Sequence, residues 1–168
     1  MAPLPAPHHH TLNAVAGWLG LGMTAEAQRE LNSLPPEFRT HRLALDSQFA
    51  IHAENALWDA AFSVAETSVK LHPDDVGGWI QRAFAARRKR GGTLDAAFAL
   101  LLPALEKFPQ EETIPYNLAC YCAQKNQLTE AWRWYRAARE IGNPSRLREM
   151  ALRDEDLKPL WAQITQLT

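Results

Sequence analysis

The sequence predicts an all-α protein, an α-solenoid of about four helix-turn-helix repeats with a C-terminal capping helical segment. A small residue recurs early in every second predicted helix, at Ala27, Ala61, Ala97 and Ala131, with spacings of 34, 36 and 34 residues. Glycine or proline interrupts the apolar pattern between the helices, and no segment has the pattern of a convincing strand. One helix pair is too small to bury its apolar face, so successive pairs are expected to share a core.

Length and composition agree with one folded unit. Of 168 residues, 46% are apolar and 22% are charged, which is typical of globular proteins. A net charge of −1 provides no broad attraction to nucleic acids or to membrane surfaces, and we expect neither as a partner. The longest apolar stretches are far shorter than the ~20 residues of a membrane span.

The first residues and the cysteines favour the cytoplasm. The N-terminal segment lacks the basic and apolar regions of a secretory signal. The two cysteines, Cys120 and Cys122, are two residues apart on a predicted helix, where their side chains point in different directions. A disulfide between them is therefore not expected, which fits a reducing compartment.

Breaks in the apolar pattern divide the chain into a flexible tail (residues 1–9), a repeat domain (10–143) and C-terminal capping helices (144–168). Gly22 is expected to break the first pair, Thr93 to cap a helix, and Pro103 to kink one because proline lacks a backbone N–H. The expected helices cover residues 11–21, 24–34, 40–53, 57–71, 76–90, 94–108, 114–125, 128–141, 145–152 and 157–164.

The period and the helix content match the tetratricopeptide signature, W-x2-L-G-x2-Y followed by A-x3-F and P. The third repeat supplies Trp79, Ala83, Ala97, Ala104 and Pro109, and the fourth supplies residues 116–122 with Ala131, Tyr135 and Ala138. The chain resembles the tetratricopeptide repeat (TPR) family over most of its length. It departs from the pattern at Val15 and Phe49, near positions where a small residue is usual. Residues 17–22, 77–80 and 154–160 are also similar to a group of bacterial TPR proteins.

The resemblance implies a concave groove that receives an extended peptide or a partner helix. Asp46 places an acid where the clamp for the C-terminal carboxylates of heat-shock chaperones has a lysine, so we do not expect that ligand. Only Asn117 matches the clamp. The groove residues implied by the family are Asp46, Gln81, Phe84, Arg88, Tyr116, Asn117, Cys120 and Gln124, with Ala50 beside them.

The candidates for chemistry have simpler structural explanations. His8 to His10 are adjacent but belong to the flexible tail, and Cys120 with Cys122 forms a C-x-C pair without a second cysteine pair. The run Arg87 to Arg90 is a phosphate-binding or localisation candidate, yet cations before Gly91 also fit a solvated helix C-terminus. Acidic residues next to the recurring alanines, Glu26, Asp59, Asp95 and Glu130, follow from the repeat. We therefore predict no catalytic site, no metal and no cofactor.

Two functions follow from the sequence. The first is a non-catalytic protein–protein interaction module, an adaptor or scaffold that binds another protein or a peptide in the groove. The alternative is a structural protein that self-associates as a homodimer through Trp132, Trp134 or Trp161. An enzyme is a remote third alternative, because the sequence shows no nucleophile paired with a base.

Overall fold

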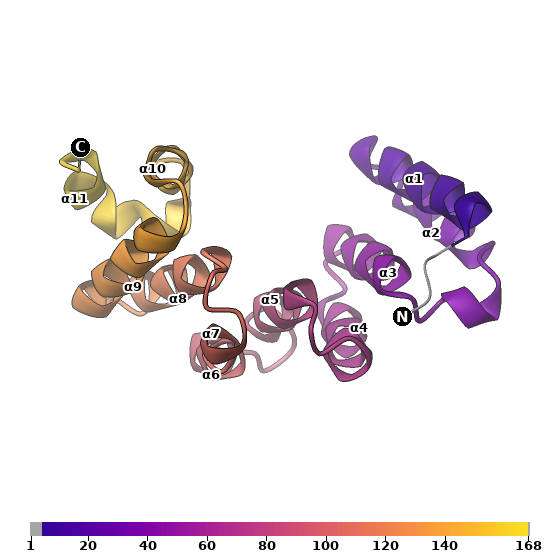
Figure 1. The fold of residues 1–168 in the computed structure, drawn as a ribbon, viewed down its shortest axis with the longest axis horizontal. Coiled ribbons are helices and arrows are strands. Elements are labelled where there is room, and N and C mark those ends of the chain that lie inside the picture. The colour runs from indigo at the N-terminus through magenta and orange to yellow at the C-terminus, as the bar shows by residue number, and fades with distance from the viewer. Residues whose placement is uncertain (1–4, 168) are drawn as a thin grey trace. The chain divides into compact units, whose positions relative to one another are not determined.

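The chain is helical throughout the part that the structure describes. The computed structural model describes residues 5–167, in which every regular element is a helix and none is a strand (Figure 1). The all-α prediction is therefore confirmed. Contacts within the chain divide it into two compact units, the first ending at Gly91 and the second beginning at Gly92. Among the described helices, none combines the length and the apolar character that a bilayer crossing requires.

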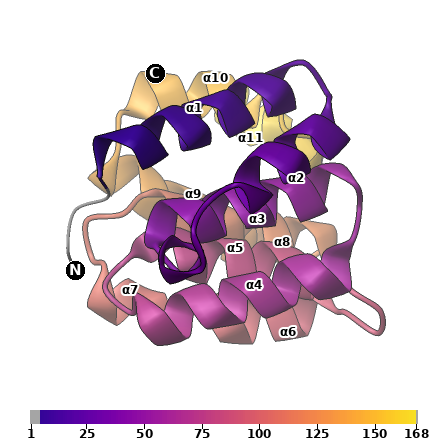
Figure 2. The same ribbon diagram turned by 90° about the vertical axis from the view of Figure 1, so that its right-hand side faces the viewer.

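The first unit consists of consecutive helix hairpins. Helix α1 packs on α2, α3 packs on α4, and α5 packs on α4 and also contacts α3. Figure 2 shows α2, α3 and α4 lying next to one another in chain order. The elements are α1 (Ala6–Gly20), α2 (Thr24–Asn32), the 3-10 helix η1 (Pro36–Phe38), α3 (Arg42–Glu54), α4 (Trp58–Leu71) and α5 (Val76–Ala86).

The second unit has one long hairpin, α8 with α9, onto which the other elements pack. Helix α6 contacts α8, η2 contacts both α8 and α9, and α10 contacts α9. The last residues thus pack on the side of the final hairpin, where capping helices were expected. The elements are α6 (Leu94–Leu101), α7 (Ala104–Lys107), α8 (Thr113–Gln124), α9 (Leu128–Ile141), α10 (Pro144–Ala151), the 3-10 helix η2 (Glu155–Leu160) and α11 (Trp161–Thr165).

Helix α1 begins earlier than the sequence predicted. Residues 6–9 were expected in a flexible tail, but α1 starts at Ala6. Pro7 is compatible with the first helical turn, where an N–H would have no intrahelical acceptor. The ring of His8 lies 4.4 Å from the ring of Phe38, so the start of α1 contacts η1. Residues 1–4 of the expected tail lie outside the described residues.

Four of the turns between described helices contain one residue in the left-handed region. Gly22, Ala56, Gly91 and Asn126 have φ of 70°, 54°, 68° and 58°, and they recur at intervals of 34, 35 and 35 residues. In three of these turns the next N–H donates to the carbonyl five residues earlier: Met23 to Trp18, Leu57 to His52 and Gln127 to Cys122, at 2.8–2.9 Å. This bond closes a Schellman-type helix end. The turns are therefore a structural repeat in their own right.

The recurring alanines are completely buried positions of four helices. Ala27, Ala61, Ala97 and Ala131 are all 0% exposed, and each lies in the first or second turn of α2, α4, α6 or α9. Apolar side chains surround the first two in separate clusters of the first unit. Because alanine has only a methyl group, the backbones of adjacent helices can approach closely at these points.

Two local signals in the sequence predicted helix ends correctly. The Thr93 hydroxyl accepts a hydrogen bond from the N–H of Ala96 at 3.0 Å, which makes it the N-cap of α6. Pro103 interrupts the predicted helix of residues 94–108, so that α6 ends at Leu101 and α7 begins at Ala104. The kink expected at this proline is therefore a full break.

The left-handed turns predict opposite effects for two neighbouring glycines. Gly22→Ala should lower the free energy of unfolding by about 1 kcal/mol, because an L-residue with a side chain is strained at positive φ. Gly20→Ala, in the exposed last turn of α1 and with no neighbouring atom within 4 Å, should raise it by up to about 1 kcal/mol. Ala56→Gly should also stabilise the protein. Urea denaturation measures all three, and shifts of the same sign for Gly20→Ala and Gly22→Ala would contradict the assignment.

Candidate functional site

Four of the eight predicted groove residues lie together in the first unit. Asp46 is on α3, Gln81 and Phe84 are on α5, and Arg88 lies two residues beyond the end of α5. The spacings of three and four residues place Gln81, Phe84 and Arg88 along one side of the helix. The N–H of Arg88 still donates to the carbonyl of Ala85 at 3.0 Å, so the helical course continues to this residue.

The polar half of this site joins α3 to α5. Gln81 Nε2 donates to Asp46 Oδ1 at 3.1 Å, and Arg42 contacts the other oxygen, Oδ2, at 2.9 Å. Arg42 also lies 3.7 Å from Asp75, just before α5. One carboxylate therefore receives an amide and a guanidinium from two different helices.

Asp46 is only partly accessible, and this changes its acidity. Its side chain retains 28% of its accessible surface. Burial raises the pKa of the Asp46 carboxyl, while the hydrogen bond from Gln81 and the charge of Arg42 act in the opposite direction. Because burial has the largest effect, charging this carboxyl in the folded protein is less favourable than in water. A partner that supplies a donor would offset part of this cost.

The other half of the site is aromatic and cationic. The guanidinium carbon of Arg88 lies 3.6 Å from the ring centre of Phe84 and 5.2 Å from the ring of Trp58. Arg88 also donates to the carbonyl of Phe84 at 3.0 Å. The rings of Trp58 and Phe84 meet edge-to-face, with centres 5.8 Å apart. Such contacts hold a guanidinium in place on an aromatic surface.

We call the surface formed by Asp46, Trp58, Gln81, Phe84 and Arg88 the α3–α5 surface. Four of its members were predicted from the family geometry, and Trp58, which also packs against the buried cluster around Ala61, was not among the predicted groove residues. Trp58 is the first residue of α4 and follows the exposed Leu57. Its position at a helix start, beside an exposed apolar residue, is the signal that would have identified it.

Of the four predicted groove residues in the second unit, two are buried rather than open to a ligand. Tyr116 and Cys120, both on α8, are 6% and 4% exposed. Asn117 donates to the carbonyl of Thr113 in its own helix at 2.8 Å, and only Gln124 is exposed. The expectation that Tyr116 and Cys120 face an open groove is therefore corrected, because η2 and the residues before it pack over this part of α8.

Asp154 connects the covering segment to α8. Its Oδ2 accepts hydrogen bonds from the Tyr116 hydroxyl at 3.0 Å and from the Cys120 thiol at 3.6 Å. Its Oδ1 accepts from the N–H of Asp156 at 3.0 Å and so caps η2. Burial, together with the neighbouring Cys120 and Asp154, raises the pKa of Tyr116, which keeps its hydroxyl protonated as a donor.

Among residues 5–167, one group of side chains has the types and spacing that could hold a metal ion: Cys120, Asp154 and Asp156. Single ligand atoms of Cys120, Asp154 and Asp156 lie within 4.8 Å of one another. Both oxygens of Asp154 already accept hydrogen bonds: Oδ2 accepts from Tyr116 on α8, and Oδ1 caps η2. The arrangement is thus accounted for by the packing of the C-terminal segment, and we assign no metal to it.

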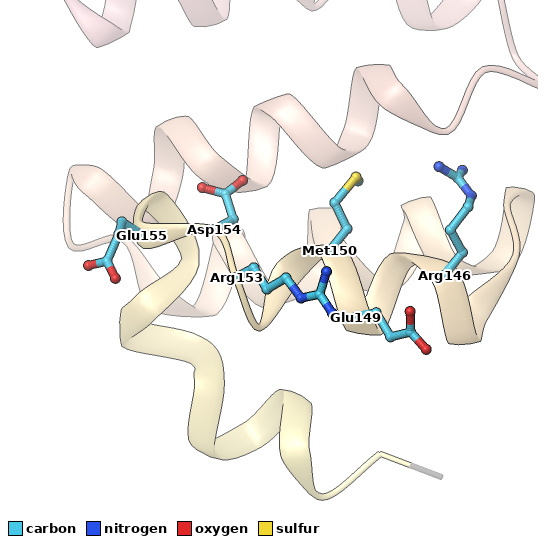
Figure 3. A pocket seen from close by; sticks show the side chains of 6 residues that line it. All are labelled: Arg146, Glu149, Met150, Arg153, Asp154 and Glu155. Atoms are coloured by element: carbon cyan, nitrogen blue, oxygen red, sulfur yellow. The ribbon is translucent and has the colours of Figure 1, made fainter.

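A shallow pocket of about 560 Å³ lies on the same segment (Figure 3). Arg146, Glu149, Met150 and Arg153 line it from α10 and its end, with Asp154 and Glu155 beyond them. Figure 3 shows Asp154 and Met150 turned toward the neighbouring helix, while Glu149 points away from it. Arg146 forms an ion pair with Glu112. Its lining is made of charged side chains and one methionine.

The remaining sequence candidates have structural roles. The recurring acids Glu26, Asp59, Asp95 and Glu130 all lie in the first turns of helices, where a negative charge is favoured by the helix dipole. The run Arg87 to Arg90 lies at the end of α5, as expected, since α5 ends at Ala86 and the N–H of Lys89 still donates to the carbonyl of Ala85 at 2.9 Å. The run is less solvated than we expected. Three of its four residues are partly buried, and Lys89 lies 5.0 Å from the ring of Phe62.

Known proteins add no assignment to this geometry. No protein-family model matches the sequence, and no curated protein matches it. The function is therefore inferred from the residues of the two units alone.

Removing the Asp154 carboxylate should loosen the C-terminal segment. Asp154→Ala leaves the buried Tyr116 hydroxyl without an acceptor and removes the η2 cap, so we expect a loss of about 1–3 kcal/mol in unfolding free energy. Hydrogen exchange should show faster exchange in η2 and α11 than in α8. Glu155→Ala is the matched control, because Glu155 is exposed and pairs only with Lys158 on the surface. Equal exchange in both variants would refute the role of Asp154.

Proposed function

We propose that this chain is a non-catalytic TPR-type helical repeat protein that binds another protein, as an adaptor or scaffold. Its binding site is the α3–α5 surface, which receives a peptide or a partner helix. The proposal includes a cytoplasmic location, which the two free cysteines favour. It requires no metal or cofactor.

The recurring features of the hairpins support the repeat architecture. Alanines at 0% exposure and turn residues of positive φ recur with nearly the same period of 34–36 residues. Two independent features, one in the helices and one in the turns, therefore share one repeat length. A period near 34 residues with two helices per repeat is characteristic of TPR proteins.

The observation that carries the binding proposal is the combination of groups on the α3–α5 surface. Asp46 and Gln81 present hydrogen-bonding groups on one part of it, and Phe84 and Trp58 present partly buried rings on the other. Polar groups of this kind fix the orientation of a peptide backbone, whereas aromatic rings provide most of the contact energy. Arg88 is held in place over the rings and lies where it can meet an acidic or polar side chain of the partner.

The chemistry of this surface disfavours one kind of peptide. Burial already makes the negative charge of Asp46 unfavourable. A peptide's C-terminal carboxylate beside it would add a second negative charge and increase this cost. An internal segment, whose backbone N–H groups donate to Asp46, fits the site better. The proposed partner therefore contributes a continuous stretch of chain rather than a free carboxyl end.

The binding proposal predicts that two substitutions on the surface abolish capture of the same partner. Full-length wild-type chain and the Gln81→Ala and Arg88→Glu variants would be used to capture proteins from the native cell, followed by mass spectrometry. Lys70→Glu is the control, since Lys70 is exposed on α4 and its charge change equals that of Arg88→Glu. Partners retained by wild type and Lys70→Glu should be lost with both surface variants.

A direct measurement then follows with the captured partner. Each surface variant should weaken binding at least about tenfold in calorimetric titration, which corresponds to about 1.4 kcal/mol. Circular dichroism verifies that both variants keep the helical content of wild type. Unchanged affinity of Gln81→Ala and Arg88→Glu would reject the α3–α5 surface as the binding site.

A further inference from the structure

The first turn of α3 is capped by a histidine instead of one of the usual capping residues. His41 is the N-cap of α3, and its Nδ1 accepts a hydrogen bond from the N–H of Leu43 at 3.3 Å. Serine, threonine, aspartate and asparagine are the side chains that usually accept this bond. A histidine can replace them only while its imidazole is neutral, because the charged ring carries a proton on both nitrogens and has no acceptor. The cap therefore depends on the protonation state of His41.

Positive groups from three helices surround this imidazole. His9 lies on α1, His72 follows the end of α4, and Arg42 is the first residue of α3. Burial, together with the charges of His72, Arg42 and His9, lowers the pKa of His41 from its ordinary value of 6.5, and only Asp46 acts in the opposite direction. A proton on His41 is thus opposed by its neighbours as well as by the loss of the cap.

The other polar side chains at this end of α3 leave that balance unchanged. His72 Nε2 donates to the carbonyl of Thr40 at 2.8 Å, a bond that either the neutral or the charged ring can make. His72 therefore stays beside His41 in both states. Of the charged side chains on η1 and just after it, Glu37 is exposed, and Arg39 donates to two carbonyls at and after the end of α2, at 3.0 and 3.1 Å.

The capped turn also carries part of the α3–α5 surface. Arg42 contacts Asp46 at 2.9 Å, and this contact requires the four-residue spacing of an intact helical turn. Arg42 also lies 3.7 Å from Asp75, just before α5. If the first turn of α3 frays, Arg42 loses its fixed position beside both carboxylates.

We propose that His41 is a pH-dependent cap, which holds the first turn of α3 while it is neutral and releases this turn when it is protonated. The charged ring points a donor at the N–H of Leu43 and places a positive charge at the positive end of the helix dipole. Release of the turn withdraws Arg42 from the α3–α5 surface, so that a partner bound there dissociates more readily in mildly acidic solution. This last step rests on the proposed function, whereas the loss of the cap does not.

The direction of the effect follows from the acidity of His41 in the two states of the chain. Because the pKa of His41 is lowered in the folded chain, the unfolded chain binds this proton more readily. The stabilising contribution of the cap is therefore complete above the ordinary pKa of 6.5 and decreases as the pH falls below this value.

Hydrogen exchange of the full-length chain at about pH 7.5 and about pH 5.5, expressed as protection factors, tests the cap on both sides of the titration. The amides of residues 43–45 all bond to His41 and should lose on the order of tenfold in protection at the lower pH. His41→Asn supplies an amide oxygen that accepts at either pH, so its protection should be the same at both. His41→Ala has no cap and should show low protection at both.

Two other histidines make the comparison specific. Burial also lowers the pKa of His52 on α3, but His52 is present in every variant, so its protonation cannot account for a difference between them. His10→Asn is the matched control, because His10 is exposed on α1, and this variant should lose protection as wild type does. An equal loss of protection in wild type and His41→Asn would overturn the cap.

The effect on binding is measured with a partner captured by the wild-type chain. Calorimetric titration should show that wild type loses more affinity than His41→Asn between the two pH values, by at least about tenfold. An equal loss in both proteins would overturn the release step. If no partner binds at the α3–α5 surface, the proposed function fails, while the exchange measurement still decides whether His41 is a pH-dependent cap.

Discussion

The close approach of two helices at completely buried alanines is the constraint on which the other features depend. Ala27, Ala61, Ala97 and Ala131 have no exposed surface, so their neighbours are fixed within van der Waals contact of a single methyl group. The left-handed residues Gly22, Ala56 and Asn126 reverse the chain over a short distance and direct α2, α4 and α9 back onto α1, α3 and α8. Together the buried alanines and the turns determine which side of each helix remains outside the hairpin. These outer sides are the surfaces available to a partner.

The α3–α5 surface follows from this division of helix faces. On α5 the buried Ala83 and Ala86 lie on a different side from Gln81 and Arg88, which leaves the latter two to meet α3 and the rings of Trp58 and Phe84. The hairpin frame therefore positions this surface, while its chemistry depends on residues that the frame does not constrain.

Local signals in the sequence were sufficient for most helix boundaries, whereas long-range contacts were not predictable from them. Gly22, Thr93 and Pro103 act through backbone geometry within a few residues; the first two behave as predicted, and Pro103 breaks the helix that it was expected to kink. The left-handed Ala56 was missed because alanine carries no turn signal; the hairpin imposes its conformation. Tyr116 and Cys120 were expected in an open groove, but Asp154, 38 and 34 residues further along the chain, covers them.

The central claim, that alanine is required where the paired helices meet, is tested most directly by two substitutions on one helix. Ala27 is fully buried in α2, which packs on α1, and Ala25, two residues away, is exposed. Urea denaturation should show that Ala27→Leu loses about 1–3 kcal/mol through overpacking, while Ala25→Leu stays within about 0.5 kcal/mol of wild type. If Ala27→Leu were as stable as Ala25→Leu, close packing at the alanine would not hold the hairpin together, and the account would be wrong.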